Sequence, residues 1–323
     1  MNALALVAHL GSYLLAPQPW DNLELFFDQS VAGIATGAIY GLVALGIVLI
    51  YRSTDVINFA QGEMALFVTF IGWSLVQADV PYFFIFLLML GLAGSMGAVI
   101  ERTVIRPVEG APVLNVVVVT LGLFVIFNSL TAFIYAQGEL PKSFPATPIG
   151  TELETFDFGI LTLQKHRVAV IIISVVVAFA LYLLFNRTKL GLAMRATAQN
   201  KVAAQLMGIN TGRMLMLGWA LSAMVGAVGG MLVAPIIFLD LTTMLRVILF
   251  AFAAAVLGGL DSPPGAMVGG VAIGVTQNLL STFAFGPIFF GPQLALPAAL
   301  LVLVLVLLIR PTGLFGRQAV RRV

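Results

Sequence analysis

Residues that could carry chemistry are few and widely spaced in this chain of 323 residues. Cysteine is absent, which excludes disulfide frameworks, thiolate metal sites and thiol nucleophiles. The two histidines, His9 and His166, are too few and too far apart for a metal cluster. The sequence also lacks the short motifs of zinc proteases, serine hydrolases and phosphate-binding loops. We therefore expect a chain that is not an enzyme and that binds no cofactor of its own.

One carboxylate, Glu63, is set into an apolar stretch beside Asn58 and Gln61. An ionisable side chain in a membrane segment is costly, so it normally faces the protein interior or a water-filled cavity. Three roles are open for Glu63: lining a solute path, pairing with a basic group such as Arg52, or stabilising the start of a broken helix. Weaker candidates for the path are polar residues for which hydrogen bonding between helices is the simpler role: Asn115, Thr120, Asn128, Gln277 and Asn278.

Long apolar runs must position these side chains, because 60% of the residues are hydrophobic and only 9% are charged. A run of about 18 or more apolar residues crosses a hydrocarbon core of about 30 Å as a helix. The candidate spans are 31–50, 57–78, 81–100, 112–135, 168–186, 214–235, 244–260, 264–286 and 292–309. The second is the doubtful one, because Gln61 and Glu63 near its start indicate a broken or re-entrant helix. The sequence predicts an all-α polytopic membrane protein with about eight or nine transmembrane helices.

Small residues recur at four-residue spacing inside these runs, at Gly33, Gly37 and Gly41 and again at Gly265 and Gly269. Such spacing lets two helix backbones approach closely in lipid. Static packing is the simpler interpretation, and a sliding or rocking interface is the alternative. The segments 37–46 and 265–274 also resemble each other, which indicates either shared packing needs or an inverted repeat.

Basic residues are distributed unevenly between the two ends of these runs. By the positive-inside rule, the loop 187–213 and the tail 310–323 are cytoplasmic, and the loop 136–167 is external. Twelve of the 16 Lys and Arg residues fall on the cytoplasmic side: Arg52, Arg102, Arg106, Arg187, Lys189, Arg195, Lys201, Arg213, Arg310, Arg317, Arg321 and Arg322.

The remaining chain divides simply around one transmembrane domain, residues 31–309. Residues 1–30 are expected to form an external or interfacial segment, with an interfacial helix over 3–16 rather than a signal peptide. The net charge of +2 gives no support for a nucleic-acid partner.

The cytoplasmic loop 187–213 holds five basic residues and no acidic ones. Its segment 195–209, beginning at Arg195, favours a helix that ends at Gly208. Apolar side chains along it could dock in a partner's groove. The alternative is a helix held on the membrane surface by its basic residues. The residues of interest are Ala203, Ala204, Leu206 and Met207.

The pattern Ala203-Ala204-x-x-x-Gly208 resembles the loop motif by which permease subunits of bacterial ABC importers engage their ATPases. Further segments are similar, in the same order, to the branched-chain amino-acid permease family, and to its first permease type. The resemblance covers about residues 25–317 and includes 57–63, 101–112, 120–122, 254–270 and 310–316. Val202 departs from it, because the family often has an acidic residue there, and Gln61 replaces a frequent His.

The resemblance implies one multi-pass permease subunit in a bacterial inner membrane, moving a small polar organic solute inward by alternating access. Branched-chain or related amino acids are the expected solutes. The implied partners are a second related permease, two ATPases that carry ATP and Mg²⁺, and an external solute-binding protein. The segment 195–209 would couple the ATPases to the spans. The rival interpretations are a stand-alone secondary transporter or channel, which needs more intramembrane carboxylates than Glu63, and a non-transporting scaffold.

Overall fold

The computed structural model describes residues 17–54, 56–136, 141–145, 154–157, 162–285, 288–289 and 291–316. The interfacial helix expected at 3–16, half of the predicted external loop 136–167 and the last residues of the tail lie outside these ranges. Among the described residues nearly all regular structure is helical. The predicted all-α polytopic class is therefore confirmed.

The helices follow the predicted runs closely. In chain order they are α2 (Leu23–Thr54), α3 (Gln61–Gln77), α4 (Tyr82–Ile100), η1 (Glu101–Ile105), η2 (Arg106–Val108), α5 (Val113–Tyr135), α6 (Lys165–Arg187), α7 (Lys189–Gln199), α8 (Lys201–Leu206), α9 (Thr211–Ile237), α10 (Thr243–Gly258), α11 (Pro263–Thr282), η3 (Pro292–Leu294) and α12 (Ala295–Ile309). Two short antiparallel pairs complete the described fold: β1 (Thr155–Asp157) with β2 (Thr162–Gln164), and β3 (Ala284–Phe285) with β4 (Ile288–Phe289).

Within the described part of the chain, six helical segments are long and apolar enough to cross a membrane, and α10 is a shorter apolar helix. Each of the nine predicted runs overlaps one α-helix. Helices α4, α5, α6 and α12 expose large apolar side chains, such as Phe84, Val125, Val176 and Leu305. An apolar outer surface of this kind suits a lipid environment, because lipid tails are as apolar as the exposed side chains.

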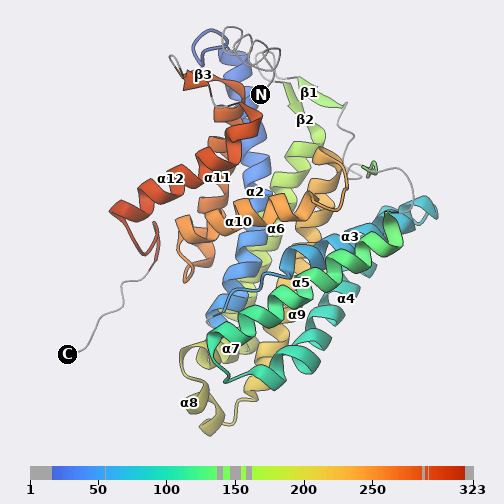
Figure 1. The fold of residues 1–323 in the computed structure, drawn as a ribbon, viewed down its shortest axis with the longest axis vertical. Coiled ribbons are helices and arrows are strands. Elements are labelled where there is room, and N and C mark those ends of the chain that lie inside the picture. Colours follow the sequence, from blue (N-terminus) through green and yellow to red (C-terminus); the bar gives the residue numbers. More distant parts are fainter. Residues whose placement is uncertain are drawn as a thin grey trace.

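Helix α2 forms the axis of the bundle and extends over most of the molecule's height (Figure 1). With 32 residues it is about 48 Å long at a rise of about 1.5 Å per residue. All of its residues from Gly37 to Ile50 are buried. A helix that is apolar on every side lies inside a bundle rather than at its edge, and α6, α9, α10 and α11 contact it.

The predicted small-residue packing joins α2 to α11. A Cβ atom on Gly37 would lie 2.6 Å from the carbonyl oxygen of Gly270, and one on Gly41 would lie 3.1 Å from the Cα of Met267. Gly33 approaches Val275 in the same way, so the two helices run antiparallel. The similar segments 37–46 and 265–274 thus pack against each other in opposite directions, an arrangement that fits both shared packing needs and an inverted repeat.

The two predicted glycines of α11 face α10 and not α2. Gly265 and Gly269 pack against α10, where the backbones of Gly258 and Ala254 leave no space for a side chain. Helix α11 is therefore held between α2 and α10 by backbone contact on both sides.

The predicted span 57–78 needs correction. Its helix, α3, begins only at Gln61 and has 17 residues. The Gln61 amide reaches the carbonyl of Val43, which precedes the end of α2 at Thr54 by about 16 Å of helix. Helix α3 thus begins deep inside the bundle, and residues 57–60 reach that depth without helical structure. The break expected near Gln61 and Glu63 is present.

Candidate functional site

A group of polar residues inside the bundle surrounds the start of α3, and we call it the α3 polar cluster. It consists of four buried residues, Asn58, Gln61, Glu63 and Ser222, and the partly buried Asn128. Asn58 organises the break, because its Oδ1 accepts a hydrogen bond of 3.0 Å from the Ala60 amide. An Asn side chain that bonds to the backbone two residues later stabilises a turn, which explains why the helix cannot start earlier.

Gln61 connects three helices at this point. Its Nε2 donates to the Val43 carbonyl of α2 at 3.0 Å. Its Oε1 accepts from the Ser222 hydroxyl of α9 at 3.1 Å, and the same hydroxyl lies 2.9 Å from the carbonyl of Gly46. Buried polar groups need such partners, and here they fix the relative positions of α2, α3 and α9.

Glu63 is fully buried, at 0% exposure, in the first turn of α3. Its Oε2 accepts a hydrogen bond of 3.0 Å from Asn128 of α5, while its Oε1 has no hydrogen-bond partner among the described residues. A carboxylate in this position is favoured by the positive end of the helix dipole. The alternative of pairing with Arg52 is not found, because Arg52 lines a cleft at the far end of α2 with Arg195.

Three of the other predicted path residues lie apart from this cluster. Gln277 accepts a hydrogen bond of 2.7 Å from the Tyr40 hydroxyl, and Asn278 donates to the Gly274 carbonyl of its own helix. Thr120 is buried and donates to the Val117 carbonyl. Hydrogen bonding within or between helices accounts for all three.

Sequence reasoning missed a second polar group, in the turn between α9 and α10. Asn128 links this turn to the α3 polar cluster, because its amide lies 3.4 Å from the Leu241 carbonyl. Asp240 forms an ion pair of 3.2 Å with Arg246 and accepts from both the amide and the hydroxyl of Thr242. Burial alone would raise the pKa of Asp240, but the Thr242 hydrogen bonds and Arg246 outweigh it and hold the pKa below its usual value. The closely spaced Asp and Thr residues were the available signal.

The predicted coupling segment differs from the single helix expected over 195–209. Helix α7 ends at Gln199, and Asn200 caps a separate helix, α8, by accepting a hydrogen bond of 2.9 Å from the Ala203 amide. Asn competes with the helix backbone for hydrogen bonds and is therefore favoured at a cap. Gly208 ends this segment with a φ of +78°, a conformation that side chains disfavour, so the predicted terminator is confirmed.

Helix α8 carries its apolar side chains on the outside. Leu206 and Met207 are 84% and 82% exposed, and Val202 is also exposed. Ala204 faces inward and is buried, whereas Ala203 is exposed. Of the two predicted alanines, one therefore packs the helix onto the chain and the other belongs to the outer surface.

Polar contacts hold α8 in place on the rest of the molecule. Lys201 forms an ion pair with Glu109, and the Gln205 amide donates to the Thr211 hydroxyl at 2.9 Å. Nearby, Arg106 binds Glu101 through two hydrogen bonds and also donates to the Gly212 carbonyl at 2.9 Å. These contacts tie α8 to the start of α9 and to Glu109 just after η2, and they tie η2 to the start of α9.

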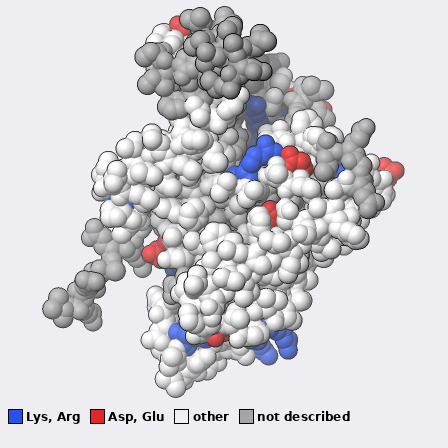
Figure 2. Space-filling view, in the orientation of Figure 1, with Lys and Arg blue, Asp and Glu red and all other residues white. Residues whose placement is uncertain are grey.

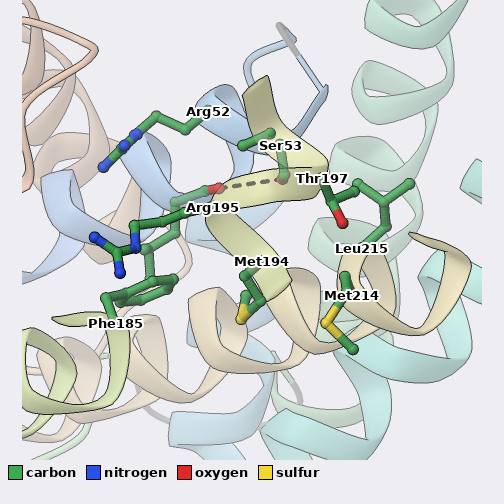
Figure 3. A pocket seen from close by; sticks show the side chains of 10 residues that line it. Arg52, Ser53, Phe185, Met194, Arg195, Thr197, Met214 and Leu215 are labelled. Carbon is green, nitrogen blue, oxygen red and sulfur yellow. Dashed lines mark hydrogen bonds between the residues drawn. The ribbon is translucent and has the colours of Figure 1, made fainter. Parts of the chain in front are cut away.

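Arg195, also a predicted coupling residue, lies on α7 apart from the exposed tip of α8. It lines a pocket between α7 and the end of α2, in which Met194 and Leu215 are buried (Figure 3). Lys and Arg residues gather at this lower end of the molecule, around α7 and α8 (Figure 2). No group of His, Asp and Glu that could hold a metal ion occurs in the described part of the chain.

Comparisons with known proteins relate the sequence to a family of transport proteins. A family model described as "Branched-chain amino acid transport system / permease component" matches residues 30–310. The high-affinity branched-chain amino acid transport system permease protein BraD of Pseudomonas aeruginosa is 30% identical, over 92% of this chain and 98% of its own. The corresponding LivH protein of Salmonella typhimurium is 29% identical with the same coverage. A probable branched-chain amino acid transport permease protein LivH of Methanocaldococcus jannaschii is 30% identical over 85% and 88%.

No solved structure matches the chain. The family match includes most of the central α2, the broken start of α3, both helices of the predicted coupling segment and all of α12. The chain therefore belongs to the family of branched-chain amino acid transport system permease components.

Proposed function

We propose that this chain is the permease subunit of a bacterial ABC importer that moves branched-chain or related amino acids inward across the cytoplasmic membrane. Its partners would be a second related permease, two ATPases and an external solute-binding protein. ATP and Mg²⁺ would be bound by the ATPases. The observation that carries the proposal is the exposed apolar tip of α8, held in a fixed position at the basic end of a family member.

The tip of α8 has the properties of a docking element. Leu206 and Met207 protrude from a short helix that is anchored by Lys201 and by Gln205. Exposed apolar side chains on a rigid helix bind in a complementary groove, with the apolar residues as anchors. A stand-alone transporter has no need for such an element.

Movement of α8 would reach the membrane interior through α9. Asn210 caps α9 by accepting a hydrogen bond of 3.0 Å from the Arg213 amide, and α9 carries Ser222 to the α3 polar cluster. The distance from Thr211 to Ser222 is about 16 Å along the helix. Closure of the ATPases would therefore shift α9 against α3 and favour one of two exposures of the solute path.

The α3 polar cluster is the proposed part of the solute path in this chain. Glu63 and Asn128 lie together, and Asn128 also contacts the turn that holds Asp240. The solute would arrive from the binding protein at that turn and at the loop 136–167. The main role of Glu63 would be to stabilise the start of α3, where the helix dipole favours a negative charge.

Copurification and uptake test the docking role. We expect the double variant Leu206→Asp, Met207→Asp to fold but to lose the ATPases on purification, because two carboxylates would be buried in an apolar groove. The matched control is Leu23→Asp, since Leu23 is 62% exposed at the other end of α2. Uptake by the double variant that equals the wild type, or uptake without ATP, would overturn the proposal and favour a stand-alone transporter.

Sidedness has a clean test because the chain contains no cysteine. Val202 and Leu23 are both exposed, so a single cysteine introduced at either position should react with a membrane-impermeant thiol reagent on its own side of the membrane. With the proposed orientation, intact cells are labelled at Leu23→Cys and not at Val202→Cys, whereas inverted vesicles show the reverse. The opposite pattern would place the coupling segment outside and contradict the proposal.

A further inference from the structure

A cleft with a volume of about 840 Å³ opens on the side of the molecule, away from the α3 polar cluster. It lies between α2, α6, α7 and the turn that joins α10 to α11. Its walls are mainly apolar and include Leu45, Phe179, Tyr182 and Met267. Neither the proposed docking tip nor the proposed solute path uses this cleft.

Two guanidinium groups lie at one end of the cleft. Arg52 projects from the last turn of α2 and Arg195 from α7. Figure 3 shows both side chains extending in the same direction, on the side of Phe185. The Nε atom of Arg195 is buried and has no hydrogen-bond partner among the described residues. The lining also holds one carboxylate, Asp261.

The apolar wall has the length of one membrane leaflet. The residues of α6 that line the cleft extend from Val175 to Asn186, which corresponds to about 16 Å of helix. A hydrocarbon core is about 30 Å thick, so one leaflet is about half of that. The guanidinium groups are at the end of this wall where α6 finishes, which is where a lipid lying along the wall would have its headgroup.

We propose that this cleft binds an anionic phospholipid of the cytoplasmic leaflet. An acyl chain would lie along α6, and the phosphate would accept hydrogen bonds from Arg52 and Arg195. Basic pockets between transmembrane helices on the cytoplasmic side recognise anionic headgroups in this way. The assignment of the leaflet rests on the orientation proposed above, whereas the chemistry of the cleft does not.

A phosphate is the ligand that the charged end fits best. Guanidinium groups present several N–H donors in a plane, which matches the oxygen atoms of a phosphate. A zwitterionic headgroup such as phosphocholine also carries a phosphate, but it adds a cation that two nearby guanidinium groups repel, so a headgroup with net negative charge is favoured. The apolar wall in turn explains why the occupant is a lipid rather than a free anion.

Native mass spectrometry of the purified, detergent-solubilised transporter tests the site, with phosphatidylglycerol and phosphatidylcholine as the two probes. We expect the wild type to retain one phosphatidylglycerol in preference to phosphatidylcholine. Arg52→Gln should weaken phosphatidylglycerol binding about fivefold, the factor that one basic residue contributes near anionic lipid. Ala178→Trp fills the apolar wall and should abolish retention of either lipid, because Ala178 lines the cleft.

Matched controls separate the cleft from general effects. Arg187→Gln removes a neighbouring charge outside the lining, and Ile172→Trp adds the same bulk on an exposed face of α6. Both should bind lipid like the wild type. Equal retention of the two lipids, wild-type retention in Ala178→Trp, or displacement of the lipid by inorganic phosphate alone would overturn the proposal.

Two further outcomes are informative about the occupant and the orientation. A photocrosslinker at Tyr182 that captures a second permease instead of lipid would show that protein covers the cleft, and would overturn the proposal. If cysteine labelling reverses the orientation, the proposed function fails, but lipid retention in detergent still reports on the cleft itself.

Discussion

The contact between α2 and α11 and the surface of α8 are built on opposite principles. In the first, backbones touch, and every side chain that would separate them is missing at Gly37 and Gly270. In the second, large apolar side chains such as Leu206 point away from the chain. The first contact is complete within the subunit, whereas the second becomes complete only with a partner.

This difference separates the rigid from the adaptable parts of the molecule. Close backbone packing in lipid is maintained by dispersion over many atoms and tolerates no added volume. The α8 surface is held by a few polar contacts, among them Lys201 with Glu109, and has space around it. We therefore expect substitutions in the two regions to fail differently: in the first through folding, in the second through assembly.

The largest expected effect breaks the contact between α2 and α11. Gly37→Leu places a side chain where even a Cβ would lie 2.6 Å from a carbonyl oxygen and 2.7 Å from the Cα of Val271. Neither backbone can move away without disturbing α10, so we expect a loss of stability of about 3 kcal/mol or more. The melting temperature of the purified protein in detergent measures it. Gly91→Leu on α4 is the control, because no atom lies within 4 Å of the added Cβ. Equal melting temperatures for the two variants would contradict the packing argument.

A smaller effect is expected between the two regions, at Glu63. Glu63→Leu removes the carboxylate that accepts the Asn128 hydrogen bond and the favourable charge in the first turn of α3. Asn128 is partly buried and keeps the Leu241 carbonyl as an acceptor, so losing the Glu63 acceptor costs about 1–2 kcal/mol. Glu63→Gln keeps an acceptor and should change stability by less than about 1 kcal/mol.

Thermal unfolding and uptake together decide what Glu63 does. If Glu63→Gln assembles and transports normally, Glu63 stabilises the helix break and has no role in the path. If it assembles but loses uptake, its charge belongs to the transport mechanism. Equal stability of the Leu and Gln variants would show that the hydrogen bond to Asn128 is unimportant.

Gly208→Val tests the adaptable region itself. Its φ of +78° is costly for a β-branched residue, by about 1–2 kcal/mol, although no atom lies within 4 Å of the added Cβ. The strain falls on the connection from α8 to α9. We therefore expect the ATPases to remain bound while uptake per ATP hydrolysed decreases. Gly122→Val on α5 is the control, since it adds the same side chain in open space. Unchanged coupling in Gly208→Val would mean that this connection transmits nothing.

Most of the helix boundaries were predictable, because apolar runs and lipid thickness determine them together. The glycine spacing also predicted close packing, and Gly33 and Gly41 contribute to it. The partner of each glycine was not predictable, since any of several small-residue faces satisfies the same pattern. Only the fold shows that α11 lies between α2 and α10.

The polar sites were predicted less completely. Asn58, Gln61 and Glu63 are neighbours in sequence, so their grouping was accessible, and Asn128 joined them only through the packing of α5 on α3. Gln277 is the same residue type as Gln61 and also lies in an apolar run, yet its side chain accepts a hydrogen bond from Tyr40 and does not join the cluster. A single sequence cannot distinguish these cases, because the choice of partner depends on helix rotation. The division between α7 and α8 at Asn200 was missed for another reason. Asn is common both at helix caps and inside loops, so its presence alone does not predict the start of a new helix.

The smallest expected effect concerns Asp240, whose turn connects the α3 polar cluster to the outer surface. The pKa of Asp240 is lowered in the folded protein, so its contribution to stability is present above the ordinary value of 3.8 and is lost as the pH falls through the lowered pKa. We therefore expect the melting temperature of the wild type to decrease slightly more than that of Asp240→Asn between about pH 7 and about pH 3. The difference should be small because the ion pair with Arg246 is partly exposed and screened by solvent.

Glu24→Gln, in the first turn of α2, controls for the general loss of negative charge. A wild type and an Asp240→Asn variant with parallel pH profiles would show that the Thr242 and Arg246 contacts do not stabilise the turn. The region around α10 would then belong with the adaptable surface of α8 rather than with the rigid contact of α2 and α11.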